Sequence, residues 1–171
     1  KTWALPRASP LGSGPVKMTG GPDLGAAAGF DKKEERAEEG GAIARSTVAD
    51  VRCGAELTFL SFGAGWCEPC RAEAPLLEAA AAELGSRSVV VAQVMFQDVE
   101  GRPAAAQFCQ FWRDALDLTI PVYIDPVENS AELFDVAATP LNLLIDRDGQ
   151  VLWSQTGKVD DVTAAIEPFL P

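Results

Sequence analysis

The spacing of hydrophobic positions changes from segment to segment after residue 55, and this pattern predicts strands that alternate with helices. Short apolar runs rich in β-branched residues predict buried strands, which cover 56–62, 88–95 and 119–124. The segments with a helical pattern are 67–84, 103–116 and 128–135. The last part predicts a β-hairpin of 141–146 and 150–153, and then a helix over 160–169 that Asp160 caps.

This order of elements predicts an α/β fold. Strands that alternate with helices form a parallel sheet, and the crossover helices cover both of its faces. The late hairpin adds antiparallel strands, so the central sheet is expected to be mixed. The chain of 171 residues is long enough for one such domain and an appendage.

The first 45 residues do not follow this pattern, and we interpret 1–45 as a flexible or extended arm before a domain at 46–171. Residues 1–30 contain ten glycine or proline residues, and 31–39 form a charge cluster, with at most one short helix, that is typical of a solvated tether. No apolar signal core follows the first residue, so we expect that any targeting segment or membrane tether lay upstream. The alternative is that part of the arm packs on the domain as an extra strand or hairpin.

Charge and composition exclude several classes of partner and site. The net charge is −11, and residues 51–171 carry all of the excess, with seven basic and eighteen acidic residues. Such a domain repels phosphate backbones and anionic lipids, so nucleic acid is not an expected partner. No apolar run reaches the roughly 18 residues that a membrane helix needs. The absence of histidine excludes Ser/His/Asp catalysis, His-ligated zinc and His-ligated haem.

Cys67 and Cys70 stand at the start of a predicted helix, where two thiols can cycle between a dithiol and a disulfide. A helix N-terminus stabilises a thiolate through its unpaired N–H groups and the positive end of its dipole. We therefore expect Cys67, at the first helical position, to be exposed and to attack a substrate disulfide. Cys70, one turn deeper, then resolves the mixed disulfide and releases the reduced substrate. The reverse sequence would oxidise a dithiol.

Glu68 bears on the direction of this exchange. A carboxylate beside a thiolate disfavours the anion, so Glu68 is expected to raise the pKa of Cys67. The pair should then hold its disulfide more firmly and act as a reductant.

A Cys-x-x-Cys pair also occurs as half of a structural zinc site, which needs two further ligands. Cys53 and Cys109 are far apart in the sequence and no histidine can complete the set, so we expect no metal and no other cofactor. Three interpretations of Cys53 and Cys109 stay open. They are two buried thiols, a structural disulfide that would fit an oxidising compartment, or a second relay pair for electrons.

These residues together resemble the thioredoxin superfamily. The matching pattern is Trp66-Cys67-x-Pro69-Cys70, Pro75 and the late Thr139-Pro140. The stretch Cys67-Glu68-Pro69-Cys70-Arg71-x-Glu73-x-Pro75 is similar to the extracytoplasmic TlpA/ResA-like thiol–disulfide oxidoreductases. The resemblance covers about residues 50–171. It implies a thioredoxin-like fold with an N-terminal extension and a central insertion, and a location in the periplasm or cell envelope.

The resemblance also implies roles for individual residues. Cys67 is then the nucleophile and Cys70 the resolving thiol, and a cis bond precedes Pro140, which lies against the disulfide and offers backbone groups to an extended substrate. The residues expected to shape the site or contact the substrate are Trp66, Glu68, Pro69, Thr139 and Pro140. The alternatives are that Pro140 is an ordinary proline at the start of a strand and that Trp66 belongs to the core.

Some positions depart from the family pattern. Ser61 stands where thioredoxins proper carry a buried aspartate that helps the deeper cysteine lose its proton. Gln97 and Asp98 lie near the end of the second strand, where the reductase branch carries its own acidic site residue, and only Asp98 can ionise. The segment Gly63-Ala64-Gly65 is smaller than its counterpart in the family, so extra room beside the disulfide is expected.

The expected function is that of an enzyme that reduces disulfides of exported proteins, works as a monomer and takes electrons from an upstream thiol donor. An oxidase or isomerase on the same fold is one alternative. A copper(I)-binding assembly module is another, and the missing His and Met ligands near the pair argue against it. A peroxidase is disfavoured because Phe62-Gly63-Ala64-Gly65-Trp66 lacks the Thr or Ser and the Pro expected before a lone reactive cysteine.

Overall fold

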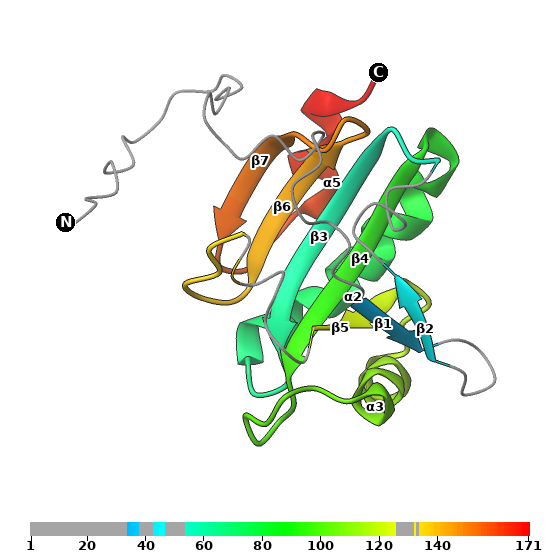
Figure 1. Cartoon of the computed structure of the whole chain (residues 1–171). Helices are drawn as coiled ribbons and strands as arrows, with labels where there is room; N and C mark the ends of the chain where they lie inside the picture. Colours follow the sequence, from blue (N-terminus) through cyan, green and yellow to red (C-terminus); the bar gives the residue numbers. More distant parts are fainter. Residues whose placement is uncertain (1–33, 38–42, 47–53, 126–131, 133) are drawn as a thin grey trace.

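The computed structural model describes residues 34–37, 43–46, 54–125, 132 and 134–171 (Figure 1). Its strands are β1 (Glu34–Ala37), β2 (Ile43–Ser46), β3 (Leu57–Ala64), β4 (Val89–Gln97), β5 (Val122–Ile124), β6 (Leu141–Asp146) and β7 (Val151–Thr156). Its helices are α2 (Glu68–Leu84), α3 (Ala106–Leu116) and α5 (Val162–Ile166), with short 3₁₀ helices at Gly85–Arg87 and Glu167–Phe169.

The strands form a single mixed sheet in the order β2-β1-β5-β4-β3-β6-β7 (Figure 1). The strands β3, β4 and β5 are parallel, and β6 runs antiparallel to β3 with β7 antiparallel to β6. The expected α/β fold with a central mixed sheet is therefore confirmed. The carboxyl end of β3 leads directly into α2, which places the two cysteines at one end of the sheet.

Alternate residues of the central strands point to opposite faces and bury two separate cores. Phe59 of β3 packs in the first core, together with buried side chains of α2, α3 and α5. Phe62 of the same strand packs in the second core. The partly buried side chains of Phe134 and Val136 pack against this core. A short helix was expected over 128–135, but most of that segment lies outside the described residues.

Two element boundaries differ from the sequence prediction for identifiable reasons. The strand expected from residue 119 begins only at Val122, because the backbone N–H groups of Thr119 and Ile120 donate to the Glu78 carboxylate at 2.8 and 3.1 Å. The last helix is capped by Asp161 and not by Asp160, since the Asp161 carboxylate accepts from the backbone N–H of Ala164 at 2.9 Å.

Part of the segment interpreted as an arm belongs to the sheet. The strands β1 and β2 pair as an antiparallel hairpin, and β1 also pairs with β5. The alternative of an added hairpin therefore describes residues 34–37 and 43–46 better than a solvated tether or a short helix does. The boundary drawn between residues 45 and 46 falls inside β2. Residues 1–33 lie outside the described part, so their interpretation as an arm stays a prediction.

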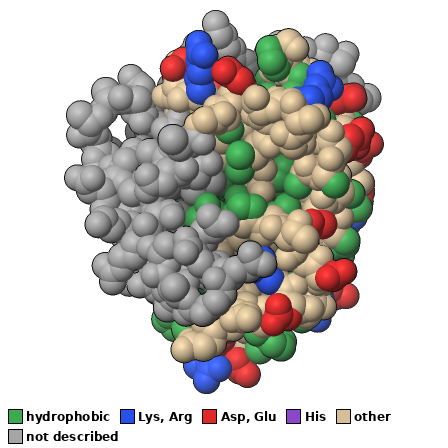
Figure 2. All heavy atoms as spheres, turned by 90° about the vertical axis from the view of Figure 1, so that its right-hand side faces the viewer, with side chains coloured by type: hydrophobic (Ala, Val, Ile, Leu, Met, Phe, Trp, Pro, Cys, Tyr) green, Lys and Arg blue, Asp and Glu red, His purple; other side chains and the backbone are tan. Residues whose placement is uncertain are grey.

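The surface in Figure 2 shows acidic and basic side chains scattered around a group of hydrophobic ones, and the described part of this face carries no continuous basic patch. This arrangement agrees with the acidic balance of the sequence. Among the helices that the structure describes, none combines the length and the apolar character that crossing a bilayer requires.

Candidate active site

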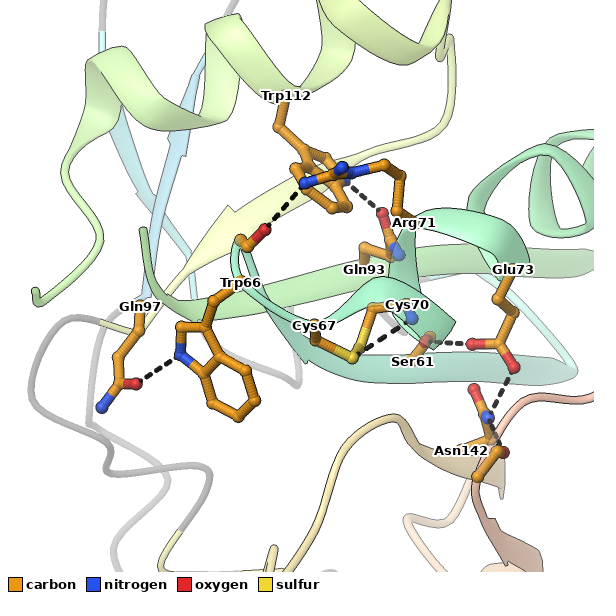
Figure 3. Close-up of a disulfide and its surroundings, with 12 residues drawn as sticks. Ser61, Trp66, Cys67, Cys70, Arg71, Glu73, Gln93, Gln97, Trp112 and Asn142 are labelled. Carbon is orange, nitrogen blue, oxygen red and sulfur yellow. Dashed lines mark hydrogen bonds between the residues drawn. A yellow bond between two sulfur atoms is a disulfide. The ribbon is translucent and has the colours of Figure 1, made fainter. Parts of the chain in front are cut away.

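The two cysteines at the start of α2 form a disulfide, with an S–S distance of 2.00 Å and a Cα–Cα distance of 5.3 Å (Figure 3). The sequence predicted Cys67 at the first position of the helix. In the structure Cys67 is instead the N-cap, and the helix begins at Glu68. Its Sγ atom accepts a hydrogen bond from the backbone N–H of Cys70 at 3.1 Å. One of the unpaired donors of the helix N-terminus is thus aimed at the sulfur that would carry the negative charge.

The expectation that Cys67 is exposed is wrong for this disulfide-bonded state. Cys67 is 3% exposed and Cys70 is 0% exposed. Ala64 and the half-buried Phe96 pack with the two cysteines in one apolar cluster. Cys67 is therefore the only one of the two sulfur-bearing residues with any exposed surface, whereas Cys70 is enclosed.

The small residues before the pair leave no spare room. A Cβ atom added to Gly63 would lie 3.2 Å from Cys70 Sγ and 3.5 Å from the sulfur of Met95. A Cβ atom on Gly65 would lie 2.6 Å from the ring of Phe108 and 2.7 Å from the backbone at Asp98. The expectation of extra space was wrong because these neighbours fill the volume that a side chain would occupy.

The loop that carries the pair is fixed to the end of β4. The backbone N–H of Gly65 donates to the Gln97 carbonyl at 2.8 Å, and the indole N–H of Trp66 donates to the Gln97 side chain at 2.8 Å (Figure 3). The Arg71 guanidinium donates to the Gly65 carbonyl at 3.3 Å. Trp66 is 52% exposed, so it stands at the surface beside the disulfide, and the interpretation that it belongs to the core is wrong.

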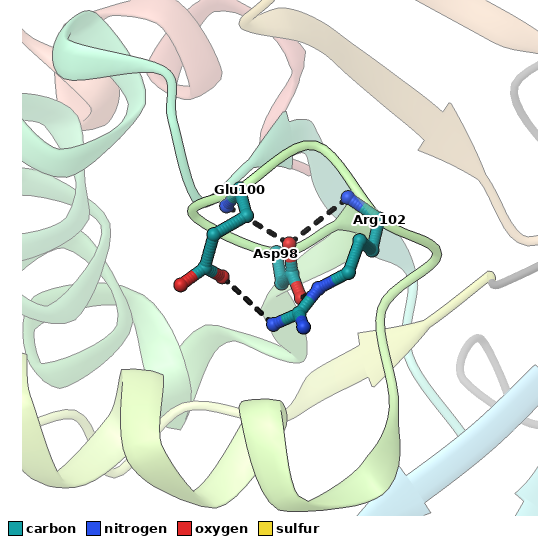
Figure 4. A network of polar contacts seen from close by, with 3 residues as sticks. All are labelled: Asp98, Glu100 and Arg102. Atoms are coloured by element: carbon teal, nitrogen blue, oxygen red, sulfur yellow. Dashed lines mark hydrogen bonds and ion pairs between the residues drawn. The ribbon is translucent and has the colours of Figure 1, made fainter.

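Asp98 is engaged elsewhere and does not serve the cysteines. Its carboxylate accepts from the backbone N–H groups of Glu100 and Arg102 at 2.9 and 3.0 Å, and from the Arg102 side chain at 2.9 Å (Figure 4). Burial alone would raise the pKa of Asp98, but these hydrogen bonds and the charge of Arg102 hold it below its ordinary value. Asp98 organises the loop after β4 and is a poor acceptor for a thiol proton.

A carboxylate that the sequence analysis did not single out lies behind the pair. Glu73 is one turn beyond Cys70 on the buried side of α2 and is 0% exposed. Its carboxylate accepts from the hydroxyl of Ser61 at 2.8 Å and the side-chain amide of Asn142 at 2.9 Å (Figure 3). It also accepts from the backbone N–H of Val159 at 2.6 Å. Glu73 thus connects the active-site helix to β3, β6 and the turn after β7.

Burial raises the pKa of Glu73 above its ordinary value of 4.5, and the three hydrogen bonds and the charge of Lys158 oppose this effect without cancelling it. The sequence did contain a signal for this residue. The apolar stripe of the helix, traced back from Leu84 through Leu77 in steps of three and four, reaches Glu73 and then Cys70. A charged residue on such a stripe needs buried partners, and Ser61 is one of them.

The peptide bond between Thr139 and Pro140 is cis. The register of β3 and β6 pairs Phe62 with Leu141, so the next residue of each strand brings Pro140 alongside Gly63. Gly63 is at the same end of this strand pair, and a Cβ atom built on it would lie 3.2 Å from Cys70 Sγ. That Pro140 lies against the disulfide stays a prediction. Its carbonyl accepts from the backbone N–H of Gly157 at 2.8 Å.

The remaining candidates take different positions. Glu68 and Pro69 are exposed in the first turn of α2, and Thr139 is half-buried. Cys109 is buried in α3, where its thiol donates to the Val122 carbonyl at 3.3 Å. Cys53 lies outside the described residues, so a disulfide between Cys53 and Cys109 stays a prediction.

Comparison with known proteins places this site in a family. Residues 27–154 match the profile described as the AhpC/TSA family, which is well over half of the chain. The chain belongs to this family. The match begins before β1 and runs through β3, α2 and β6, so it includes every element that builds the disulfide site.

Individual relatives share the redox chemistry. The chain is 30% identical to the thioredoxin-like protein YneN of Bacillus subtilis over 63% of this chain and 59% of YneN. It is 26% identical to the thiol–disulfide oxidoreductase ResA of Bacillus cereus over 83% of this chain and 82% of ResA. The exposed lipoprotein thioredoxin Etrx1 of Streptococcus pneumoniae, at 28% identity, superimposes with a TM-score of 0.62 over 80% of this chain and 96% of Etrx1. The thioredoxin-like fold is thereby confirmed, and the ResA relative is a thiol–disulfide oxidoreductase.

Proposed function

We propose that this protein is a thiol–disulfide oxidoreductase that reduces disulfides of exported proteins through a Cys67/Cys70 dithiol–disulfide cycle. The observation that carries the proposal is the disulfide at the N-terminus of α2, with Cys70 N–H donating to Cys67 Sγ. The same donor stabilises the thiolate of Cys67 once the pair is reduced. The deeper sulfur is enclosed, which restricts Cys70 to the resolving role.

The cycle balances two electrons and two protons. The Cys67 thiolate attacks one sulfur of the substrate disulfide, and the other sulfur leaves as a thiolate that takes a proton from water. The Cys70 thiol then loses its proton and its sulfur attacks Cys67 Sγ, which breaks the mixed disulfide. The second substrate sulfur leaves as a thiolate and also takes a proton from water, so the substrate is released as a dithiol. The protein is left with the Cys67–Cys70 disulfide and has given up two electrons.

Glu73 is our candidate for the group that takes the proton of Cys70. It lies one turn away on the same buried face of α2, and burial places its pKa above the ordinary carboxyl range. A carboxylate with a raised pKa accepts a thiol proton more readily than an exposed one does. In Glu73→Gln, the mixed disulfide with a peptide should persist longer than in the parent protein, because the proton acceptor is gone.

The substrate is expected at the side of the disulfide where Trp66 and Pro140 lie. Trp66 is exposed and fixed by Gln97, and Pro140 precedes Leu141, which pairs with Phe62 next to Gly63. Backbone groups next to Pro140 are suited to an extended polypeptide, and the exposed Glu68 and half-buried Thr139 can contact its side chains. These assignments of substrate-contacting residues are part of the proposal.

We also infer an extracytoplasmic location and an upstream thiol donor. The similarity to a pneumococcal exposed lipoprotein supports this location. The donor is proposed to be a dithiol protein or a small thiol, because a protein disulfide is reduced by exchange with another thiol. Each cycle is completed by two cysteines of one chain, so the protein is proposed to act as a monomer.

The direct test is reduction of insulin disulfides by the parent protein with dithiothreitol as donor, compared with Cys67→Ser and Cys70→Ser. We expect activity in the parent and none in either variant. Equal rates in the parent and in Cys67→Ser would refute the proposal. The midpoint potential of the pair then separates a reductant from the alternative oxidase or isomerase, for which a potential near that of strongly oxidising relatives is expected, about −120 mV.

Copper(I) binding by the reduced pair is a second candidate, because the structure corrects the argument against it. A Cβ atom built on Gly63 would lie 3.5 Å from the sulfur of Met95 and 3.2 Å from Cys70 Sγ. A thioether is therefore close to the thiols. Thiolate and thioether ligands suit Cu(I). Competition for Cu(I) with a chromophoric chelator tests this candidate. It is rejected if the reduced protein removes no Cu(I), or if Met95→Leu competes as well as the parent.

A further inference from the structure

Asn142, the second residue of β6, makes contacts that the exchange reaction does not require. It is 0% exposed, and its side-chain N–H groups donate to the Glu73 carboxylate at 2.9 Å and to the Gly157 carbonyl at 3.2 Å (Figure 3). Its side-chain oxygen is buried and has no hydrogen-bond partner among the described residues. A buried amide with an unpartnered oxygen is unfavourable, so an apolar side chain would cost less at this position if packing were the only requirement.

The two acceptors of Asn142 belong to different parts of the site. Glu73 stands on the helix that carries the cysteines. Gly157 follows β7, and its backbone N–H donates to the carbonyl of Pro140 at 2.8 Å. Val159, two residues later, donates to the same Glu73 oxygen at 2.6 Å. Asn142 and Glu73 together therefore hold the segment 157–159, and this segment holds Pro140.

We propose that Asn142 is a positioning residue that connects the proton state of Glu73 with the placement of the Pro140 segment beside the disulfide. The inference rests on the proposed function and adds a coupling between thiol chemistry and the hold on the substrate. An ionised carboxylate accepts hydrogen bonds about twice as strongly as a neutral acceptor. When Glu73 takes a proton, its bonds to Asn142 and to Val159 weaken together, and segment 157–159 is held less firmly.

This coupling favours turnover, because it holds the substrate before the mixed disulfide is resolved and releases the product afterwards. Before the mixed disulfide is resolved, Glu73 is ionised and Pro140 is held against the substrate. Resolution moves a proton from Cys70 to Glu73 and loosens that hold, which favours release of the reduced product. The other charged group near Glu73 is Lys158, which pairs with Asp160, and Ser61 contributes a neutral hydroxyl from β3.

The experiment compares two substrates in the full chain. One is a disulfide-containing peptide, which needs the Pro140 segment, and the other is bis(2-hydroxyethyl) disulfide, which has no backbone to bind. In Asn142→Leu we expect KM for the peptide to rise about tenfold, which corresponds to losing one hydrogen bond to a charged group. The rate constant for the small disulfide should change by less than twofold. Thr163→Val is the matched control, because the Thr163 hydroxyl donates to the Glu83 carboxylate at 3.0 Å, away from Glu73 and from segment 157–159.

Asn142→Asp provides a second readout, because the aspartate side chain has the same size and shape as asparagine. This variant also tests the inference if Asn142→Leu does not fold. At low pH a proton shared between the introduced carboxyl group and Glu73 restores one donor, so KM of this variant for the peptide should rise with pH more steeply than that of the parent. An unchanged peptide KM in a folded variant, or an equal loss with both substrates, overturns the inference. If the parent protein itself reduces neither substrate, the proposed function is wrong, and that result is distinct from a failure of the Asn142 coupling.

Discussion

The hydroxyl of Ser61 donates to the carboxylate of Glu73 at 2.8 Å, and neither residue is exposed. Ser61 occupies the position on β3 where thioredoxins proper are expected to carry a buried aspartate. In this chain the negative charge comes instead from the helix, and the serine binds it. The active-site pair thus retains a buried carboxylate nearby, although the residue that supplies it lies on another element.

Glu73 should make stability depend on pH in a definite direction. Its pKa is raised in the folded protein, so the folded state binds more protons than the unfolded state above the ordinary value of 4.5. Stability is fully present below that pH and is lost as pH rises towards the raised pKa. In Glu73→Gln the amide oxygen can accept from Asn142 and Val159 while its N–H donates to Ser61, so this loss should disappear.

The measurement is the free energy of urea unfolding of the parent and of Glu73→Gln between pH 4 and pH 8. The other titrating groups are common to both proteins and cancel in the difference. We expect the difference to move in favour of the variant as pH rises. A difference that is constant over this range would show that burial of Glu73 does not govern its ionisation.

Glu68 should influence the redox pair through its charge alone, because it is exposed in the first turn of α2. In Glu68→Gln we expect the pKa of the Cys67 thiol to fall by roughly a few tenths of a unit and the midpoint potential to become less negative. The thiolate absorbance at 240 nm reports the first quantity and a glutathione redox titration the second. The neutralisation of Glu167, an exposed carboxylate at the far end of the chain, is the matched control and should leave both values unchanged.

Gly65 should not tolerate a side chain. An added methyl group would lie 2.6 Å from the Phe108 ring and 2.7 Å from the backbone at Val99, and backbone atoms cannot move aside cheaply. We expect Gly65→Ala to lower the free energy of unfolding by about 1–3 kcal/mol, as overpacking does elsewhere. Gly85→Ala is the control, because Gly85 has helical φ and no atom near its Cβ position, and its stability should stay equal or rise. Equal stability changes in the two variants would contradict the packing described here.

Removing the hydroxyl of Thr58 should make the folded protein more stable. Its Oγ1 atom is buried in β3 and finds no hydrogen-bond partner among the described residues. Thr58→Val keeps the shape and removes the unpartnered polar atom, so the free energy of unfolding should rise by about 1 kcal/mol. Denaturant titration monitored by circular dichroism measures it. A variant that is less stable than the parent would mean that the hydroxyl has a partner in solution.

The hydrophobic periodicity of the sequence was sufficient to predict the central strands and helices, and the cysteine spacing was sufficient to predict the disulfide. The β-branched run before Gln97 and the stripe ending at Leu84 predict β4 and α2 closely, because burial of an apolar face decides both. The cysteine spacing predicts the redox pair for a geometric reason, since side chains three residues apart on a helix are neighbours on one face.

The sequence was insufficient where polar contacts between distant segments decide the structure. The start of β5 depends on Glu78, forty-one residues before Thr119, and the hairpin β1–β2 depends on an open edge at β5. The role of Glu73 depends on Ser61, Asn142 and Val159 meeting around one carboxylate. Such meetings are set by the register of strands that pair across the sheet, which no local pattern records.

The most direct test of the central claim is mass spectrometry of Cys70→Ser after incubation with a disulfide-bonded peptide. Removing the resolving thiol should leave a stable mixed disulfide, and peptide mapping should locate the adduct at Cys67. An adduct found at Cys109, or no adduct at any cysteine under conditions where the parent reduces the peptide, would contradict the account.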